Sequence, residues 1–209
     1  MNLTSRMSTA GGILVVAITL SGCAGTSGEP AAGTASPSVA SSASTSPGRV
    51  DDKHNRVDAE FTQNMVVHHE GAIVMADLAA RVASTPEVKA LGQRISAAQE
   101  PEIIEMKSWL VAWGEQSAAD VNMDGMDMGG MDMGGLSQDE AMSELKAAEG
   151  TAFDRRFLEL MIEHHRGAIE MADTQLASGT NPQALALARS IIDAQNAEIT
   201  EMEQLLQAL

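Results

Sequence analysis

Two stretches decide the fold of this chain, and they are near copies of each other. Residues 58–76 read DAEFTQNMVVHHEGAIVMA, and residues 154–172 read DRRFLELMIEHHRGAIEMA. Both keep an aspartate, a phenylalanine, a methionine, a histidine pair, an alanine and a second methionine in the same order and spacing. Each residue of the second copy follows its counterpart by 96 positions, as Asp154 follows Asp58. The chain is therefore predicted to contain two homologous structural units.

The same offset persists downstream of the two copies. It relates Pro86 to Pro182, Gln99 to Gln195, Glu102 to Glu198, Glu105 to Glu201 and Met106 to Met202. Four of the five histidines and six of the 14 methionines thus occupy repeated positions. Since thioether and imidazole groups are ligands that soft transition metals prefer, above all copper, the repetition indicates metal binding.

Each repeat has the pattern of a helical hairpin. In the first, apolar or ligand-type residues recur at positions 61, 65, 68, 72, 75 and 79, which is one stripe of a helix. Thr85-Pro86 and Asn181-Pro182 then predict the turn and the capped start of each second helix. Two such hairpins, rich in alanine and poor in aromatic residues, predict an all-α fold, an antiparallel four-helix bundle.

Two capping signals lie between the hairpins. Ser137 with Glu140 predicts the start of a short extra helix. After Gly150, Thr151 with Asp154 is close to a second capping box, which would open the second hairpin.

The candidate metal ligands come from this stripe and from the facing helix. Folding each hairpin about its turn brings the first methionine and the histidine pair to the height of the glutamate and methionine on the second helix, within about one turn. The predicted ligands in repeat one are Met65, His68, His69, Met75, Glu102 and Met106. Those in repeat two are Met161, His164, His165, Met171, Glu198 and Met202.

This donor set predicts copper as the bound metal. Sulfur and nitrogen favour Cu(I), and nitrogen with carboxylate oxygen accepts Cu(II). Taken singly, each methionine is typical of core filling, and only the repetition of the whole set favours a metal. The sequence leaves open which histidine of each pair is the ligand. It also leaves open whether Met75 and Met171 serve a second, sulfur-richer position or only the core.

The segment between the hairpins is rich in methionine, aspartate and glycine. A polar, glycine-rich linker has no packing reason to hold methionine, so we interpret these residues as an auxiliary capture segment for Cu(I) or Ag(I). The predicted capture residues are Met123, Met126, Met128, Met131 and Met133. Low-complexity drift is the alternative interpretation.

The N-terminal region predicts export and lipidation. An apolar run at 13–20, too short to span a bilayer, precedes Leu20-Ser21-Gly22-Cys23, the pattern of a bacterial lipoprotein cleavage site. Cys23, the only cysteine, is the expected lipidation site. The expected location is the outer face of the cytoplasmic membrane, at the cell surface or in the periplasm.

The predicted organisation follows from these features. Residues 1–22 form a lipoprotein signal peptide, 23–50 a disordered tether of Ser, Ala and Pro, and 51–209 the duplicated bundle, divided into repeat one (51–116), the Met-rich linker (117–136) and repeat two (137–209).

The chain is strongly acidic, with a formal net charge of −16. Such a surface repels nucleic acid and anionic lipid headgroups, so we expect no nucleic-acid partner and membrane contact only through the lipid anchor. Metal ions are the expected partners, and the sequence identifies no copper-handling protein partner.

The repeated motif resembles that of a known family. Phe-x3-Met-x2-His-His-x2-Ala-x2-Met-Ala, present from Phe61 and again from Phe157, is similar to the hallmark of the bacterial DUF305 family, a ferritin-like helical group that includes CopM-type copper-binding proteins. The resemblance covers about residues 51–209. It implies a four-helix bundle and copper binding through Met and His, in exported proteins associated with copper resistance.

Three functions are therefore compared. The first is a non-enzymatic, lipid-anchored protein that sequesters or shuttles copper for homeostasis or resistance. The second is a ferritin-like metalloenzyme such as a di-metal oxidase, for which the usual Glu-x2-His is missing but Glu102-x2-Glu105 and Glu198-x2-Glu201 remain. The third is an inert surface lipoprotein, which leaves the repeated sulfur and imidazole unexplained.

Overall fold

Residues 50–117, 133 and 135–209 are described by a computed structural model of the chain. The predicted signal peptide with Cys23, the tether up to residue 49, and Met123, Met126, Met128 and Met131 lie outside the described residues.

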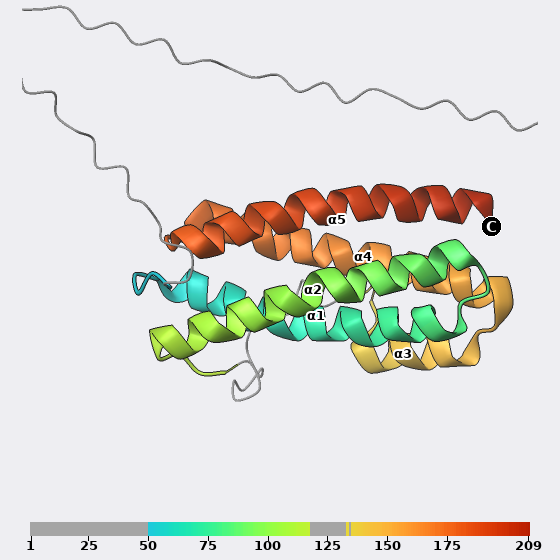
Figure 1. The fold of residues 1–209 in the computed structure, drawn as a ribbon, viewed down its shortest axis with the longest axis horizontal. Helices are drawn as coiled ribbons and strands as arrows, with labels where there is room; N and C mark the ends of the chain where they lie inside the picture. The colour runs from blue at the N-terminus through green and yellow to red at the C-terminus, as the bar shows by residue number, and fades with distance from the viewer. Residues whose placement is uncertain (1–49, 118–132, 134) are drawn as a thin grey trace, which may run out of the picture. The chain divides into compact units, whose positions relative to one another are not determined.

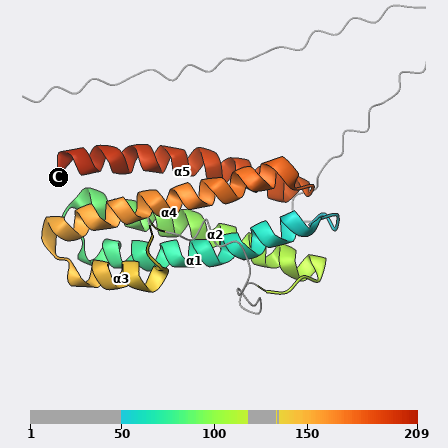
Figure 2. The ribbon, with the colours of Figure 1, turned by 180° about the vertical axis from the view of Figure 1, so that it is seen from behind.

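Every regular element in this part of the chain is a helix. The helices are α1 (Arg56–Val82), α2 (Pro86–Trp113), α3 (Gln138–Ala147), α4 (Gly150–Ser178) and α5 (Pro182–Ala208). Helix α1 packs against α2, α4 packs against α5, and α1 packs against α4, so the two hairpins lie side by side, as Figures 1 and 2 show. This arrangement confirms the predicted all-α bundle of two helical hairpins. None of the described helices has both the length and the apolar character needed to cross a bilayer.

The predicted helix starts are found at three of four positions. Thr85 and Asn181 cap α2 and α5, each followed by proline at the first helical position. Ser137 caps α3 through a reciprocal box with Glu140.

The capping box predicted around Asp154 is wrong. Helix α4 begins at Gly150, four residues before Asp154, and has no side-chain cap. The Asp154 carboxylate instead accepts hydrogen bonds from the Ser84 amide (2.7 Å), the Ser84 hydroxyl (2.6 Å) and the Thr85 amide (2.8 Å). The second hairpin therefore holds the turn of the first.

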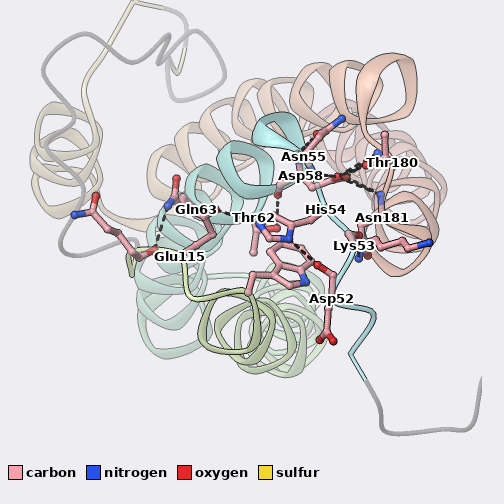
Figure 3. A network of polar contacts seen from close by, with 12 residues as sticks. Asp52, Lys53, His54, Asn55, Asp58, Thr62, Gln63, Glu115, Thr180 and Asn181 are labelled. Atoms are coloured by element: carbon pink, nitrogen blue, oxygen red, sulfur yellow. Dashed lines mark hydrogen bonds and ion pairs between the residues drawn. The ribbon is translucent and has the colours of Figure 1, made fainter.

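Asp58 holds the other turn in the same way. Its carboxylate, with no exposed surface, accepts from Gln175 Nε2 at 2.6 Å. Asp58 accepts further from the Thr180 amide and hydroxyl and from the Asn181 amide (Figure 3). It also closes a capping box with Asn55 at the start of α1. Each repeated aspartate thus binds the turn of the opposite repeat, and the two contacts fasten the antiparallel α1 and α4 at both ends.

The chain before α1 is fastened at the Asp58 end. The Asp51 carbonyl accepts from Trp113 Nε1 at 2.9 Å and from Asn181 Nδ2 at 3.0 Å. His54 stacks on Trp113 with ring centroids 4.6 Å apart and lies 3.1 Å from the Glu115 carboxylate (Figure 3). This segment therefore joins the end of α2 to the start of α5.

The first hairpin is closed by an unusually tight helix contact. A Cβ built on Gly92 of α2 would lie 2.5 Å from the Ala76 carbonyl oxygen of α1, closer than real Cβ atoms approach. The corresponding residue of repeat two is Ala188, which is buried without such a restriction. Only glycine fits at position 92, and the two hairpins differ in this respect.

The two aspartate contacts should dominate the stability of the bundle. Asp58→Asn and Asp154→Asn are each expected to lower the free energy of unfolding by about 2–3 kcal/mol, because the amide nitrogen would face buried donors. Urea denaturation followed by circular dichroism measures the change. Asp173→Asn, at an exposed position of α4, is the control. Equal effects at Asp173 and Asp154 would contradict this role.

The same carboxylates set the response to acid. Burial raises the pKa of Asp58 and Asp154, but the hydrogen bonds that they accept outweigh it and leave both below the ordinary value of 3.8. A lowered folded-state pKa contributes stability above about pH 4 that is lost as the pH falls through that lowered pKa. Urea titrations between pH 6 and pH 2 should therefore show an acid-induced loss that the doubly substituted Asp58→Asn/Asp154→Asn protein lacks. An unchanged acid limb would refute the assignment.

Candidate metal centre

The two repeats meet through one histidine from each. Nδ1 of His164 in α4 lies 2.6 Å from Nε2 of His68 in α1, and the rings are edge to face with centroids 3.7 Å apart. Both side chains are almost completely buried. The predicted ligands of the two repeats are therefore joined at the centre of the bundle, where a separate group in each repeat had been expected.

The second histidine of each pair binds a carboxylate of its own hairpin. His69 Nε2 lies 2.8 Å from Glu102 Oε2, and His165 Nε2 lies 2.6 Å from Glu198 Oε2. The imidazoles are fully buried, while the glutamates keep roughly a quarter of their side-chain surface exposed. The predicted partnership between each pair and the facing glutamate is present. A carboxylate on one ring nitrogen is typical of a histidine whose other nitrogen binds a metal, and here that other nitrogen is Nδ1.

The four histidines His68, His69, His164 and His165 form a layer across the bundle, called the histidine layer below. The methionines separate into two groups, one on each side of it. The Trp109 half of the core contains Met65, Met106 and Trp109, with Met171 partly buried against it. The α3 half contains Met75, Met161, Met202 and Met133, with Met142 partly buried against it. Each half thus combines two methionines of one repeat with one from the other, since Met75 joins Met161 and Met202 while Met171 joins Met65 and Met106.

One linker prediction needs correction. Met133 was expected in a polar capture segment outside the core, but only 3% of its surface is exposed. Its amide donates to the Leu136 carbonyl at 3.3 Å, and α3 follows directly. Met133 therefore belongs to the apolar core, which the composition of its own segment did not predict, because most members of that cluster come from α1, α2 and α4.

Helix α3 also reaches the histidine layer. Gln138 Nε2 donates to the Gly71 carbonyl at 3.0 Å. A Cβ on Gly71 would lie 2.9 Å from Gln138 Oε1 and 3.4 Å from His164 Nε2. The start of α3 thus lies against Gly71 of α1 and close to Nε2 of His164. The sequence spacing alone did not predict this contact.

Several buried polar atoms around the histidines have no partner among the described protein groups. They are Nδ1 of His69 and His165 and Oε1 of Gln99 and Gln195. Buried polar atoms normally have a hydrogen-bond partner, so this symmetrical set is suited to a ligand or water.

Burial keeps the central imidazole neutral. Desolvation, reinforced by His165 and His69, lowers the pKa of His164 from 6.5 to about 3. A neutral imidazole has a lone pair to give to a metal, whereas a protonated one has none.

The donor set fits a soft cation better than a hard one. No group of three or more His, Cys, Asp or Glu side chains within the described residues could hold a metal ion. The further donors that the described core offers are methionine sulfur and the amide oxygens of Gln99 and Gln195. Two nitrogens that bind one ion at about 2.0–2.1 Å lie roughly 3–4 Å apart, so His68 and His164 must separate slightly to share an ion.

Two elements of the arrangement were missed from the sequence. Asp58 and Asp154 are the first residues of the two repeated stretches, and their repetition could have indicated the contacts between the hairpins.

His54 lies outside the repeats, and no feature of the sequence indicated its contacts. Its contact with the Asp52 carbonyl raises its pKa above 6.5, with smaller contributions from Glu115 and an opposing effect of burial. It lines an open polar cavity of about 450 Å³ together with Gln63 and Glu115.

The chain is similar to several solved structures of helical proteins. A putative secreted DUF305 protein from Streptomyces coelicolor is 32% identical with a TM-score of 0.65, and the match covers 73% of this chain and 93% of that one. A DUF305 fragment from Deinococcus radiodurans is 28% identical with a TM-score of 0.64, covering 74% and 98%. CopM in the Cu(I)-bound form is 34% identical with a TM-score of 0.59, covering 72% and 96%.

No curated protein matches the chain. The family described as "Domain of unknown function (DUF305)" matches residues 58–206. This match spans both repeats and agrees with the resemblance drawn from their shared motif, so the chain belongs to the DUF305 family.

Proposed function

We propose that this protein is an exported, lipid-anchored copper-binding protein that sequesters or shuttles Cu(I), accepts Cu(II), and has no catalytic turnover. The observation that carries the proposal is the buried pair of His68 and His164, with methionine sulfur on both sides of it in the core. Export and anchoring through Cys23 rest on the N-terminal sequence.

The chemistry of the site supports copper over harder metals. The core offers thioethers and neutral imidazoles, which suit Cu(I), and the carboxylates of Glu102 and Glu198 stand behind His69 and His165. CopM, to which this chain is similar over most of its length, has been solved in Cu(I)-bound, Cu(II)-bound and Ag-bound forms. Similarity to a protein with those ligands favours a copper-related role here.

A di-metal oxidase is the alternative, and the second glutamate of each Glu-x2-Glu pair argues against it. Glu105 is exposed, and Glu201 forms an ion pair with Arg94 of α2. A carboxylate-bridged site would need these groups directed toward the core. Metal analysis by mass spectrometry of untagged protein, purified after growth with Cu, Zn or Fe, separates the functions. We expect copper to be retained, whereas iron with oxygen-dependent turnover would favour the oxidase.

The methionines next to the histidines should govern Cu(I) affinity. Met65→Leu/Met161→Leu keeps core volume, so the fold should persist while Cu(I) affinity falls by about tenfold or more. Competition with a calibrated Cu(I) chelator measures the change. Ile191→Leu, a core substitution that removes no sulfur, is the control. Unchanged Cu(I) affinity in the double variant would count against the whole assignment.

Cu(I) and Cu(II) should respond differently to pH. Thioethers do not titrate, whereas an imidazole that takes up a proton can no longer bind a metal, and Cu(II) depends on nitrogen and oxygen donors. Because burial lowers the pKa of His164 to about 3, we expect Cu(II) affinity to fall more steeply than Cu(I) affinity between pH 5 and pH 3. Parallel competition titrations with chelators calibrated at each pH give the two slopes. Equal slopes over that range would count against sulfur as a Cu(I) ligand.

A further inference from the structure

The two halves of the core are unequal in sulfur, although the repeats that build them are matched. The Trp109 half has three methionines, Met65, Met106 and Met171. The α3 half has the three counterparts, Met161, Met202 and Met75, and adds Met133 and Met142. The additional two have no repeated counterpart, since Met133 lies in the linker and Met142 lies in α3.

The additional methionines are held in place by a firmly docked helix. Ala141 and Leu145 of α3 are fully buried, and Gln138 donates to the Gly71 carbonyl. At the far end of the helix, Arg156 of α4 binds Glu144 at 2.7 Å. Met133 and Met142 flank the start of this helix and belong to the same half of the core as Met161.

The position of the α3 start also distinguishes the two central histidines. Gln138 and Gly71 lie against the outer nitrogen of His164. Met161 precedes His164 by three residues, so the two side chains can share a face of α4. The α3 side of the histidine layer therefore holds His164 Nε2, beside Gly71, and the half of the core with more methionines.

We propose that the α3 half is the stronger of two soft-cation sites, and that Met133 and Met142 make it so. The class of ligand is a soft monovalent cation, Cu(I) or Ag(I), because the added donors are thioethers only. Methionine has three rotatable side-chain bonds, so five sulfurs in one region give an ion a wider choice of low-strain coordination than three do. The inference rests on the proposed copper-binding function and adds an order of filling to it.

The structure supplies a separate reporter for each half. Both tryptophans of the chain, Trp109 and Trp113, belong to the Trp109 half, so tryptophan fluorescence reports on that side. Methionine methyl groups labelled with carbon-13 report on both sides by NMR. Silver(I) serves as the probe because it is soft and does not change oxidation state during a titration.

The test is a titration of the full-length chain with silver nitrate. The first equivalent that enters the core should shift the methyl resonances of Met75, Met133, Met142, Met161 and Met202 while tryptophan fluorescence stays constant. Further silver should then shift Met65, Met106 and Met171 and change the tryptophan signal. The methyl groups of residues 123–131 are followed separately, since the order of filling concerns the two halves.

Matched variants assign the cause. Met133→Leu/Met142→Leu preserves apolar volume and should weaken silver binding in the α3 half by about tenfold or more. The α3 half should then no longer fill before the Trp109 half. Met171→Leu, which removes a partly buried methionine from the Trp109 half, should leave the order of filling as it is. Methyl spectra without silver verify that each variant is folded.

The outcomes separate this inference from the function on which it rests. Simultaneous filling of both halves, or Met133 and Met142 resonances that never move, would overturn the inference and leave copper binding standing. Failure of silver and Cu(I) to bind either half would remove the proposed function, and the inference with it.

Discussion

The rest of the structure depends on one constraint: an aspartate of each repeat binds the turn of the other repeat through hydrogen bonds. Asp58 binds Thr180 and Asn181, and Asp154 binds Ser84 and Thr85. The two contacts lie at opposite ends of the antiparallel α1 and α4, so they fix the sliding of one helix along the other. A shift of one turn would move a residue by about 5.4 Å. Within that fixed register His68 and His164, each ten positions after its aspartate, face each other.

The burial of charged aspartates is consistent with this role. A buried carboxylate without partners is unfavourable, and here each has several donors from backbone amides and hydroxyl groups. The energy gained depends on the opposite hairpin being in place, since the donors belong to that hairpin. The hydrophobic core alone would tolerate several alignments of alanine-rich helices, whereas these directional contacts select one. The same aspartate contacts thus select the alignment of the two hairpins and position the candidate metal centre.

Much of this arrangement could be predicted from the repeated residues, because helix periodicity, proline-capped turns and a constant offset act locally. The pairing of His69 with Glu102 followed from folding one hairpin about its turn. The contact between His68 and His164 did not, because it depends on how two hairpins dock, and periodicity carries no information on that. The placement of Met133 was wrong for a similar reason: its neighbours in the sequence are polar, and its neighbours in space come from other helices.

Duplication accounts for the symmetry of the centre, and the segment inserted between the copies accounts for its departure from symmetry. A symmetrical pair of hairpins would present two equivalent sulfur groups to one histidine layer. Helix α3 covers only one side of that layer, against Gly71 and His164. Burial keeps the His164 imidazole neutral, and its Nδ1 lies 2.6 Å from Nε2 of His68. In the proposed function, an ion that enters this site would replace that contact by metal–nitrogen and metal–sulfur bonds, and the unequal supply of sulfur would give the replacement a preferred side.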